Sequence, residues 1–587
     1  MRLLFDCETD GLLRKLTTIH CLVVMDIDTK EIFEFDDSGQ RETITTGLTL
    51  LMEAKELWGH NLTGFDIEAC RSVYPFFHPR CKVYDTLILS RLFYNDLVER
   101  DLRSTPANMP AQCYGKHSLE AWGYRMGVYK SEFGKQLEGD WSTYSPQMLK
   151  YCVGDVKANL PLVEMFAPKI VKYQQAIDLE HACAKIMTWQ EQEGFPFDVK
   201  KAQQLESKLR IELEALDQEM RSKICFVPGI EFTPKRDNKT LGYVANAPMT
   251  RVKDFNPTSR EHIAYMFTTM RGWTPLEKTE TGKAKIDETV LKGIGTEEAL
   301  KFARILELQK GLGQVSEGNN AWLKLVEPDG RIHHSCFLNT VTGRNCHVRP
   351  NIAQVNSGHE YRELFYPGPH RIQLGADASS LELRCLSHFL AGFGNTDFGK
   401  EVVEGDIHQR MADISGVSRK VQKSITYALL YGSGSLKLGL VAGASKQDAA
   451  KRGAELKEKL LTGIDGFKDL VDAVQKKAES GYLRGLDGRP LKVRKPFAAL
   501  NTLLQGAGAC ICKAWLVRSN ELLTEAKLDY FPLAFVHDEM QLSVDKNDVP
   551  MATDLIKMAM KDVEHTTKFR VPLDCDVQTG SNWGDTH

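Results

Sequence analysis

The stretch Ser418-Arg-Lys-Val-Gln-Lys-Ser-Ile-Thr-Tyr-Ala-Leu-Leu-Tyr-Gly432 predicts a helix whose two faces differ in chemistry. Two cations and two phenols follow one another at i+4 intervals along one face: Arg419, Lys423, Tyr427 and Tyr431. The opposite face is apolar and suited to packing. Ser418 is a candidate N-cap, and Gly432 supplies the stop. The polar face could bind a triphosphate and stack under a base, or it could be the solvated side of an amphipathic helix.

Length and composition indicate a globular protein of several domains. The 587 residues suggest about four domains, and 42% hydrophobic with 26% charged residues excludes a disordered or fibrous chain. Because the net charge is only -3, nucleic-acid binding has to rest on local basic clusters. The 14 cysteines show no metal-ligand spacing, which favours reduced thiols and a cytoplasmic location. We find no signal-peptide layout and no apolar run near the ~20 residues of a membrane helix, so no membrane is expected as a partner.

Carboxylates recur at strand ends and helix starts in the N-terminal segment, which reads as α/β. Asp6 and Glu8 end the first strand two residues apart and therefore share one face of it. Asp66 closes the run Asn61-Leu-Thr-Gly-Phe-Asp66, and Asp155 lies in the helical context Tyr151-Cys-Val-Gly-Asp155. Converging carboxylates need a cation, and hard oxygen ligands select Mg²⁺ or Mn²⁺. Two such ions about 4 Å apart can activate a water for phosphodiester cleavage, and Tyr151, one turn before Asp155, could orient that water.

In this order and spacing, these residues resemble the DEDDy type of 3′-5′ proofreading exonuclease. The resemblance implies a ribonuclease H-like fold with Asp6, Glu8, Asp66 and Asp155 as metal ligands and Tyr151 as a catalytic residue.

The middle of the chain is helical with one irregular connection. Helical spacing runs from Asp178 to about Lys223 and returns at Ser259–Met270 and Glu297–Gln314. Between them, Ile224–Asp254 carries prolines and glycines among basic residues and is predicted to be an irregular connection.

A second pair of carboxylates lies in the C-terminal half. Arg371-Ile-Gln-Leu-Gly-Ala-Asp377 predicts a strand with an acidic end, and Leu533–Val544 predicts a hairpin with Asp538 at its exposed tip. If the hairpin lies beside that strand, the two carboxylates meet above one sheet and can hold two Mg²⁺ ions. A primer 3′-hydroxyl could then attack the α-phosphate of a bound nucleotide, while the cationic helix face neutralises the pyrophosphate leaving group.

The ordered set Asp377-Ala-Ser-Ser-Leu-Glu-Leu-Arg384, Arg419-x3-Lys423-x3-Tyr427-x3-Tyr431-Gly432 and Val536-His-Asp-Glu539 resembles motifs A, B and C of the family A DNA polymerases. The likeness covers essentially the whole chain and is greatest to the compact replicative polymerases of tailed phages. It implies an α/β and α+β multidomain fold, an exonuclease domain followed by a right-hand polymerase domain with palm, fingers and thumb. The implied boundaries are 1–177 for the exonuclease, 178–330 for the thumb and connection, 331–400 for the first part of the palm, 401–484 for the fingers and 485–587 for the second part of the palm.

The resemblance also implies a role for each matched position. Asp377 and Asp538 would ligate Mg²⁺, with Mn²⁺ as an alternative. Lys423 would be the proton donor to pyrophosphate, and Arg419 and His408 would face the phosphates. Glu382 and Tyr427 would close against the sugar, and Tyr431 would lie by the templating base. The expected contacts to primer-template DNA come from Arg344, Asn501, Gln505, His537 and Glu539.

Two departures from the family pattern bear on partners and helix packing. Ala428 stands where these enzymes often have glycine in the helix. The Ile224–Asp254 connection is too short for the insertion by which some phage relatives capture host thioredoxin, so a thioredoxin-type factor is not expected. The expected partners are primer-template DNA, dNTPs and a replisome helicase-primase or single-strand binding protein, in the cytoplasm of an infected bacterium.

Two alternatives stay open at this point. A single-subunit RNA polymerase shares the palm and fingers, although Glu382 and the exonuclease motifs argue against it. A nucleic-acid binding protein with decayed sites is the other, although all six metal-binding carboxylates are present.

Overall fold

A computed structural model describes residues 1–128, 141–275, 277–279, 281–445 and 447–587. The described chain divides into two compact units. Unit 1 comprises Met1–Phe195, His333–Ala353 and Tyr366–His587, and unit 2 comprises Pro196–Ile332 and Gln354–Phe365. No helix in the described ranges is long and apolar enough to cross a membrane.

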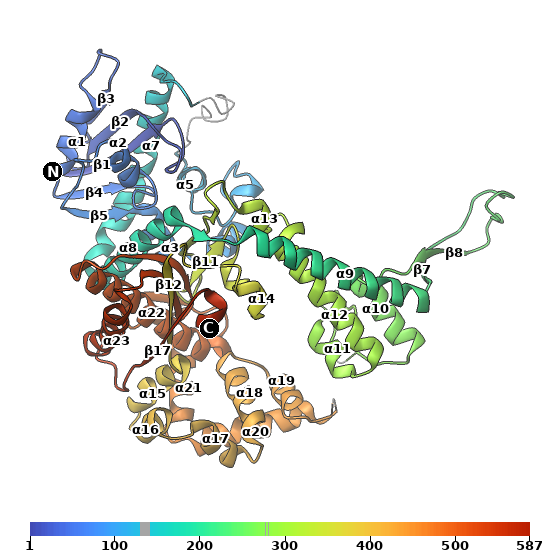
Figure 1. Ribbon diagram of the computed structural model, residues 1–587. Helices are drawn as coiled ribbons and strands as arrows, with labels where there is room; N and C mark the ends of the chain where they lie inside the picture. The colour runs from blue at the N-terminus through green and yellow to red at the C-terminus, as the bar shows by residue number, and fades with distance from the viewer. Residues whose placement is uncertain (129–140, 276, 280, 446) are drawn as a thin grey trace. The chain divides into compact units, whose positions relative to one another are not determined.

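The N-terminal part of unit 1 is a five-stranded sheet covered by helices (Figure 1). The strands are β1 (Arg2–Thr9), β2 (Ile19–Asp26), β3 (Ile32–Asp36), β4 (Glu56–Gly59) and β5 (Lys82–Asp85), in the order β3-β2-β1-β4-β5. The first three strands are antiparallel, whereas β1, β4 and β5 are parallel. The helices are α1 (Ile44–Met52), α2 (Asp66–Val73), α3 (Thr86–Phe93), α4 (Leu97–Arg103), α5 (Leu119–Met126), α7 (Pro146–Phe166) and α8 (Ile170–Glu193).

Strand β1 has apolar residues on both faces, so the sheet has a core on each side. Leu3 and Phe5 belong to one buried cluster and Leu4 to the other, as the two-residue period of a strand requires. Pairing between β1 and β4 reaches Leu4 opposite Trp58. The acidic end of β1, from Asp6 onward, therefore extends past that pairing.

The C-terminal part of unit 1 is built on an antiparallel sheet with the order β15-β16-β12-β17. Its strands are β12 (Arg371–Ala378), β15 (Tyr530–Val536), β16 (Glu539–Asp545) and β17 (Cys575–Gly580). Two small hairpins, β10 (Ser335–Leu338) with β11 (Asn345–Val348) and β13 (Tyr482–Arg484) with β14 (Pro490–Lys492), accompany it. The helices are α15 (Leu381–Ala391), α16 (Asp397–Glu404), α17 (Ile407–Ser415), α18 (Arg419–Leu430), α19 (Ser435–Val441), α20 (Ala449–Gly463), α21 (Phe467–Ala478), α22 (Ala499–Glu525) and α23 (Val549–Thr566).

Unit 2 is a helical body with one extended hairpin. Its helices are α9 (Val199–Lys223), α10 (Arg260–Tyr265), α11 (Glu288–Ile294), α12 (Glu297–Leu312), α13 (Trp322–Leu325) and α14 (His359–Arg362). Helix α9 is joined to α12 by a bidentate ion pair in which Arg304 donates to Glu212 at 2.7 and 2.8 Å. These helices share a buried core that includes Met220 and Phe302.

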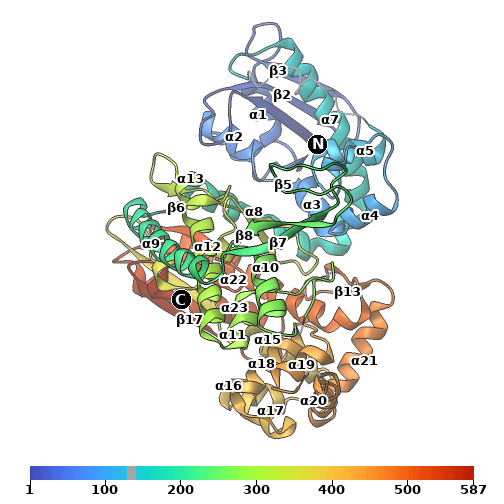
Figure 2. The ribbon, with the colours of Figure 1, turned by 90° about the vertical axis from the view of Figure 1, so that its right-hand side faces the viewer.

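The prediction that Ile224–Asp254 is an irregular connection is wrong in part, because the two ends of this segment pair as antiparallel strands. Strands β7 (Phe226–Phe232) and β8 (Met249–Asp254) pair antiparallel and run side by side in Figure 2. The register shifts between Pro228 and Glu231, and a Cβ added at Gly229 would lie 2.6 Å from the carbonyl oxygen of Arg251. Proline and glycine, which indicated a loop, are thus accommodated in a bulge of the ladder.

Helix α8 also differs from the expected course of the chain. It starts at Ile170, before the predicted boundary at 178, and contains a non-helical residue at Tyr173. Its residues up to Glu193 belong to unit 1 and not to the helical unit 2. The predicted helical pattern from Asp178 to about Lys223 comprises the part of α8 after this kink and helix α9.

Candidate functional site

The C-terminal hairpin lies beside the strand that ends at Asp377, as the sequence predicted. In the antiparallel pair β12–β16, Asp377 lies opposite Glu539. The backbone N–H of Ala378 donates to the carbonyl oxygen of Asp538 at 3.0 Å, which holds the hairpin tip to the end of β12. His537 takes a positive φ of 59° in this two-residue turn. Asp377 and Asp538 therefore come together at one edge of the sheet.

The acidic residues at this edge disfavour one another's ionised forms. Burial raises the pKa of Asp377 to about 7, and the neighbouring Asp538 and Glu539 add to the effect. Burial and the carboxylate of Glu382 raise the pKa of Asp538 as well. Grouped carboxylates that ionise reluctantly match a divalent cation, which would remove their repulsion. The residues present therefore fit a hard metal ion.

Glu539 is directed toward the C-terminal segment of the chain. Its side chain is only 4% exposed. One oxygen accepts from Trp583 Nε1 at 2.5 Å and Gln541 Nε2 at 2.7 Å, and the other lies 2.9 Å from His587 Nδ1. Burial would raise the pKa of Glu539, but the hydrogen bond and charge of His587 lower it on balance. Glu539 thus has protein partners of its own, which no motif predicted.

Helix α18 spans Arg419–Leu430, close to its predicted limits. Ser418 occupies the N-cap position, although its hydroxyl makes no capping hydrogen bond. At the other end Gly432 has φ +76°, and Ser433 N–H donates to the carbonyl of Ala428 at 2.8 Å, as in a Schellman motif. The side chain of Ala428 packs, half-buried, against the main core cluster. The predicted stop at Gly432 is therefore confirmed, Ser418 holds the N-cap position without capping through its side chain, and Ala428 contributes to packing.

The polar face of α18 meets residues of the preceding helix α17. Arg419 Nε lies 2.6 Å from Asp406 Oδ2, just before α17. The ring of His408 is 6.1 Å from that of Tyr427. Burial, followed by the charges of Lys423 and Arg419, lowers the pKa of His408. These residues form a cationic patch in which Arg419 and Lys423 are exposed.

Glu382 joins this helix to another loop of unit 1. Its Oε1 accepts from the Tyr431 hydroxyl at 3.0 Å and lies 3.4 Å from Arg344 Nη2. Burial and the carboxylate of Glu382 raise the pKa of Tyr431 to about 12. Tyr427 stacks on Tyr431, with ring centroids 6.4 Å apart. The hydroxyl of Tyr431 is thus a direct partner of Glu382, while the closing of Glu382 and Tyr427 against a sugar stays a prediction.

Asn501 and Gln505, the other predicted DNA contacts, lie one turn apart on α22 and are half-buried.

In the N-terminal sheet, Asp6 and Glu8 come together with a residue that the sequence analysis missed. One donor atom from each of Asp6, Glu8 and Cys152 lies within 4.8 Å of the others. The thiol of Cys152 also donates to the carbonyl oxygen of Asp6 at 3.3 Å. Cys152 comes from α7, directly after Tyr151, and no general spacing rule for metal sites would have selected it.

The remaining predicted residues of this site lie on two helices. Asp66 begins α2, is 3% exposed, and accepts from the backbone N–H and thiol of Cys7 at 3.2 and 3.4 Å. Burial raises the pKa of Asp66 to about 7, although the hydrogen bonds from Cys7 oppose the rise. Asp155, which is buried, and Tyr151 both lie on α7. Asp66 and Asp155 are outside the close Asp6–Glu8–Cys152 group.

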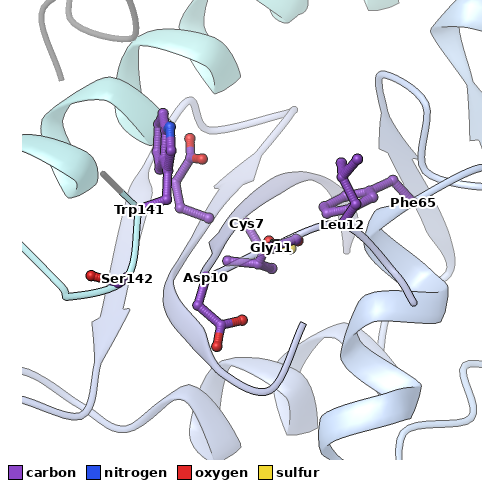
Figure 3. A pocket seen from close by; sticks show the side chains of 9 residues that line it. Cys7, Asp10, Gly11, Leu12, Phe65, Trp141 and Ser142 are labelled. Atoms are coloured by element: carbon purple, nitrogen blue, oxygen red, sulfur yellow. Dashed lines mark hydrogen bonds between the residues drawn. The ribbon is translucent and has the colours of Figure 1, made fainter. Parts of the chain in front are cut away.

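A cavity of about 490 Å³ opens beside Glu8. Figure 3 shows Trp141 on one side of it and Leu12 with Phe65 on the other. The full lining consists of Cys7, Glu8, Thr9, Asp10, Gly11, Leu12, Phe65, Trp141 and Ser142. Trp141 also meets the ring of Tyr151 edge-on at 6.1 Å. The apolar side chains of Leu12, Phe65 and Trp141 suit a flat base, and a cation held by the nearby carboxylates would balance the charge of a phosphate.

Comparison with known proteins matches the chain to one family. The model of DNA polymerase family A matches residues 237–585. The DNA-directed DNA polymerases of Enterobacteria phage T3 and Escherichia phage T7 are each 33% identical to the chain, over 100% and 99% of both proteins respectively. DNA polymerase I of Bacillus caldotenax is 25% identical over 75% of this chain and 50% of its own.

A solved structure has the same fold. The POL domain of Pol1 from M. smegmatis, in complex with DNA primer-template and dNTP, superposes with a TM-score of 0.74 at 17% identity, covering 100% of this chain and 96% of that one. The family model spans more than half of the chain, and the phage relatives match all or nearly all of it. The chain therefore belongs to DNA polymerase family A and is a DNA-directed DNA polymerase.

Proposed function

We propose that the chain extends a DNA primer at the edge formed by Asp377 and Asp538 and removes 3′-terminal nucleotides at the separate Asp6–Glu8 centre. The observation that carries the first assignment is the β12–β16 pairing, which brings Asp377 and Asp538 close enough for the charge of Asp538 to act on the pKa of Asp377. The carboxylate of Asp538 also acts on the pKa of Tyr427 in α18. The boundaries predicted for exonuclease, thumb, palm and fingers are part of this proposal.

Asp377 and Asp538 would hold Mg²⁺ ions in the polymerase site. When bound, such ions orient the α-phosphate and lower the pKa of the primer 3′-hydroxyl. Both carboxylates must be ionised to serve as ligands, and the raised pKa of each means that ionisation and metal binding occur together.

The cationic patch of α17 and α18 would bind the triphosphate. Arg419 would leave its ion pair with Asp406 and bind a phosphate instead, again through a charge-assisted hydrogen bond between guanidinium and oxyanion. Lys423 Nζ would donate a proton to the departing pyrophosphate, and His408 would add a hydrogen bond. Exposure of Arg419 and Lys423 leaves them accessible to a ligand.

Nucleotide choice would rest on Glu382, Tyr427 and Tyr431. The Tyr431 hydroxyl holds Glu382 in the free enzyme. An incoming base that displaces Tyr431 would free Glu382 to close against the sugar together with Tyr427, excluding a ribose 2′-hydroxyl. Arg344, Asn501, Gln505 and His537 would contact the primer-template, and Glu539 would support the hairpin tip.

At the second site, Asp6, Glu8, Asp66 and Asp155 would ligate Mg²⁺ or Mn²⁺, and Tyr151 would orient the attacking water. The adjacent cavity supports this assignment, because Leu12, Phe65 and Trp141 offer apolar surfaces to an unpaired 3′-terminal base. We place the enzyme in replication of a phage genome in a bacterial cytoplasm, with dNTPs and primer-template DNA as substrates and a helicase-primase or single-strand binding protein as partners.

The test is primer extension with dNTPs or rNTPs, using wild type and Asp538→Ala. We expect wild type with Mg²⁺ to add dNTPs far faster than rNTPs, and Asp538→Ala to add neither while it still binds primer-template. Full extension by folded Asp538→Ala would refute the assignment of the polymerase site.

A further inference from the structure

Four charged side chains that belong to neither carboxylate pair are buried together in unit 1. They are Glu180 of α8, Lys513 of α22, and Asp487 and Arg489 of the turn between β13 and β14. Each side chain is at most 4% exposed. Arg489 Nη1 lies 2.6 Å from Glu180 Oε1, and its Nη2 lies 2.6 Å from Asp487 Oδ2. Lys513 Nζ lies 2.6 Å from the other oxygen of Glu180. Two positive and two negative charges thus form a closed, neutral cluster.

Stability alone is a weak reason for such a cluster. Removing ions from water costs several kcal/mol for each ion, and apolar side chains of similar volume often serve as well. A fork-shaped guanidinium held between two carboxylates does, however, have a fixed position and orientation. The guanidinium of Arg489 is therefore held rigidly, and another segment of the chain can pack against it in a defined position.

The turn between β10 and β11 packs against the guanidinium of Arg489. Gly343 in this turn has φ +82°, and a Cβ added there would lie 2.6 Å from Arg489 Nη1. The turn is closed by two internal hydrogen bonds, from Gly343 N–H to the carbonyl of Thr340 at 3.2 Å and from the Thr340 hydroxyl to the carbonyl of Arg344 at 2.8 Å. The backbone that carries Arg344 therefore rests against the guanidinium of Arg489.

A continuous chain of contacts then leads to the nucleotide-binding helix. Arg344 Nη2 reaches Glu382 at 3.4 Å, and the Tyr431 hydroxyl at the end of α18 donates to the same carboxylate oxygen at 3.0 Å. A shift of the turn by a few tenths of an ångström would lengthen the Arg344–Glu382 contact beyond its present 3.4 Å. Contacts of this length weaken steeply with distance.

We propose that Arg489 is a positioning residue for sugar selection: it sets the 340–344 turn so that Arg344 can orient Glu382. This inference rests on the proposed role of Glu382 in excluding the ribose 2′-hydroxyl. Arg489 itself is buried, 1% exposed, and in this proposal it acts only through the turn.

The first test compares kcat/KM for dNTP and rNTP addition in wild type, Arg489→Lys, Arg344→Ala and the double variant. Lysine keeps the charge but loses the fork, so we expect discrimination against rNTP to fall about tenfold, the effect of one charge-assisted hydrogen bond. Because Arg489 acts through Arg344, the double variant should discriminate no worse than Arg344→Ala alone. Additive losses, or unchanged discrimination in folded Arg489→Lys, would overturn the proposal.

A glycine pair keeps the test valid if Arg489→Lys fails to fold. Gly343→Ala forces a methyl group onto Arg489, whereas Gly394, with φ +89° and nothing within 4 Å of its added Cβ, offers the same backbone strain without the contact. We expect Gly343→Ala to lose discrimination and Gly394→Ala to retain it, with similar losses of thermal stability from backbone strain. Equal discrimination in the two variants would overturn the proposal.

Glu382→Ala separates this inference from the function on which it rests. Loss of discrimination in Glu382→Ala, with none in Arg489→Lys and Gly343→Ala, would overturn only the positioning role. Retention of discrimination in Glu382→Ala would overturn the role of Glu382 and with it the inference.

Discussion

Replacing Asp66 with asparagine should stabilise the metal-free N-terminal sheet and its helices at pH 8. Burial raises the pKa of Asp66 from 3.8 to about 7, so the folded protein retains a proton that the unfolded chain releases. Stability contributed by this group therefore falls as pH rises from about 4 to 7 and stays low above 7. A shift of roughly three pKa units corresponds to about 4 kcal/mol. We expect a gain of about 2–4 kcal/mol for Asp66→Asn at pH 8, with little change at pH 4.

Hydrogen exchange of the amides in β1 and α2 is the appropriate assay, because a chain of two compact units need not unfold in one step. With EDTA at pH 8, the variant should exchange more slowly than wild type after correction for intrinsic rates. Added Mg²⁺ should slow exchange in wild type and have little effect on the variant. Faster exchange in Asp66→Asn at pH 8, or the same pH dependence as wild type, would refute the reasoning.

Asp85→Asn is the matched control, with the opposite expected sign. Asp85 is 1% exposed, and its carboxylate accepts the backbone N–H groups of Asn61, Thr63 and Leu87 at 2.8, 3.0 and 2.9 Å. An amide has only one acceptor oxygen, so at least one buried N–H loses its partner at a cost of about 1–3 kcal/mol. Exchange should therefore accelerate in this variant.

Three further outcomes are expected. Tyr427→Phe should lower dideoxynucleotide incorporation relative to dNTP incorporation, as measured by primer termination; an unchanged ratio would remove Tyr427 from the sugar position. Because the pKa of Asp377 is raised to about 7, the Mg²⁺ concentration for half-maximal extension should fall between pH 6 and 8 as that carboxylate ionises; a requirement independent of pH would contradict this. Trp583→Phe removes one of the donors to buried Glu539 and should lower stability by about 1–3 kcal/mol; calorimetry that finds no loss would contradict this.

Local sequence signals predicted the elements that carry the polymerase site. The acidic strand end at Asp377, the hairpin turn at Asp538 and the ends of α18 are specified by residues close together in the chain, and the structure places these elements where they were predicted. Two details differ: Asp538 is half-buried and not exposed, and the Ser418 hydroxyl makes no capping hydrogen bond. The alternation of polar and apolar residues along β16 did not predict that both faces of this strand are buried. Gln541 and Ser543, the polar residues that alternate with Met540, Leu542 and Val544, are at most 1% exposed.

The burial of that polar face follows from contacts between residues distant in sequence. Gln541 is bonded to Gln373 of β12 at 2.7 Å and to Thr586 of the C-terminal segment at 2.9 Å. A two-residue period identifies the two faces of a strand but not what covers each of them. Cys152 escaped prediction for the same reason, because only folding brings α7 against the end of β1.

One time course tests most directly whether the chain has two separate sites. A primer with a mismatched 3′ terminus is incubated with template, dNTPs and Mg²⁺, using wild type, Asp538→Ala and the double variant Asp6→Ala with Glu8→Ala. Wild type should shorten the primer and then extend it, Asp538→Ala should only shorten it, and the double variant should not shorten it but should extend a matched primer. Loss of both activities in folded Asp538→Ala, or persistent shortening in the double variant, would contradict two separate sites.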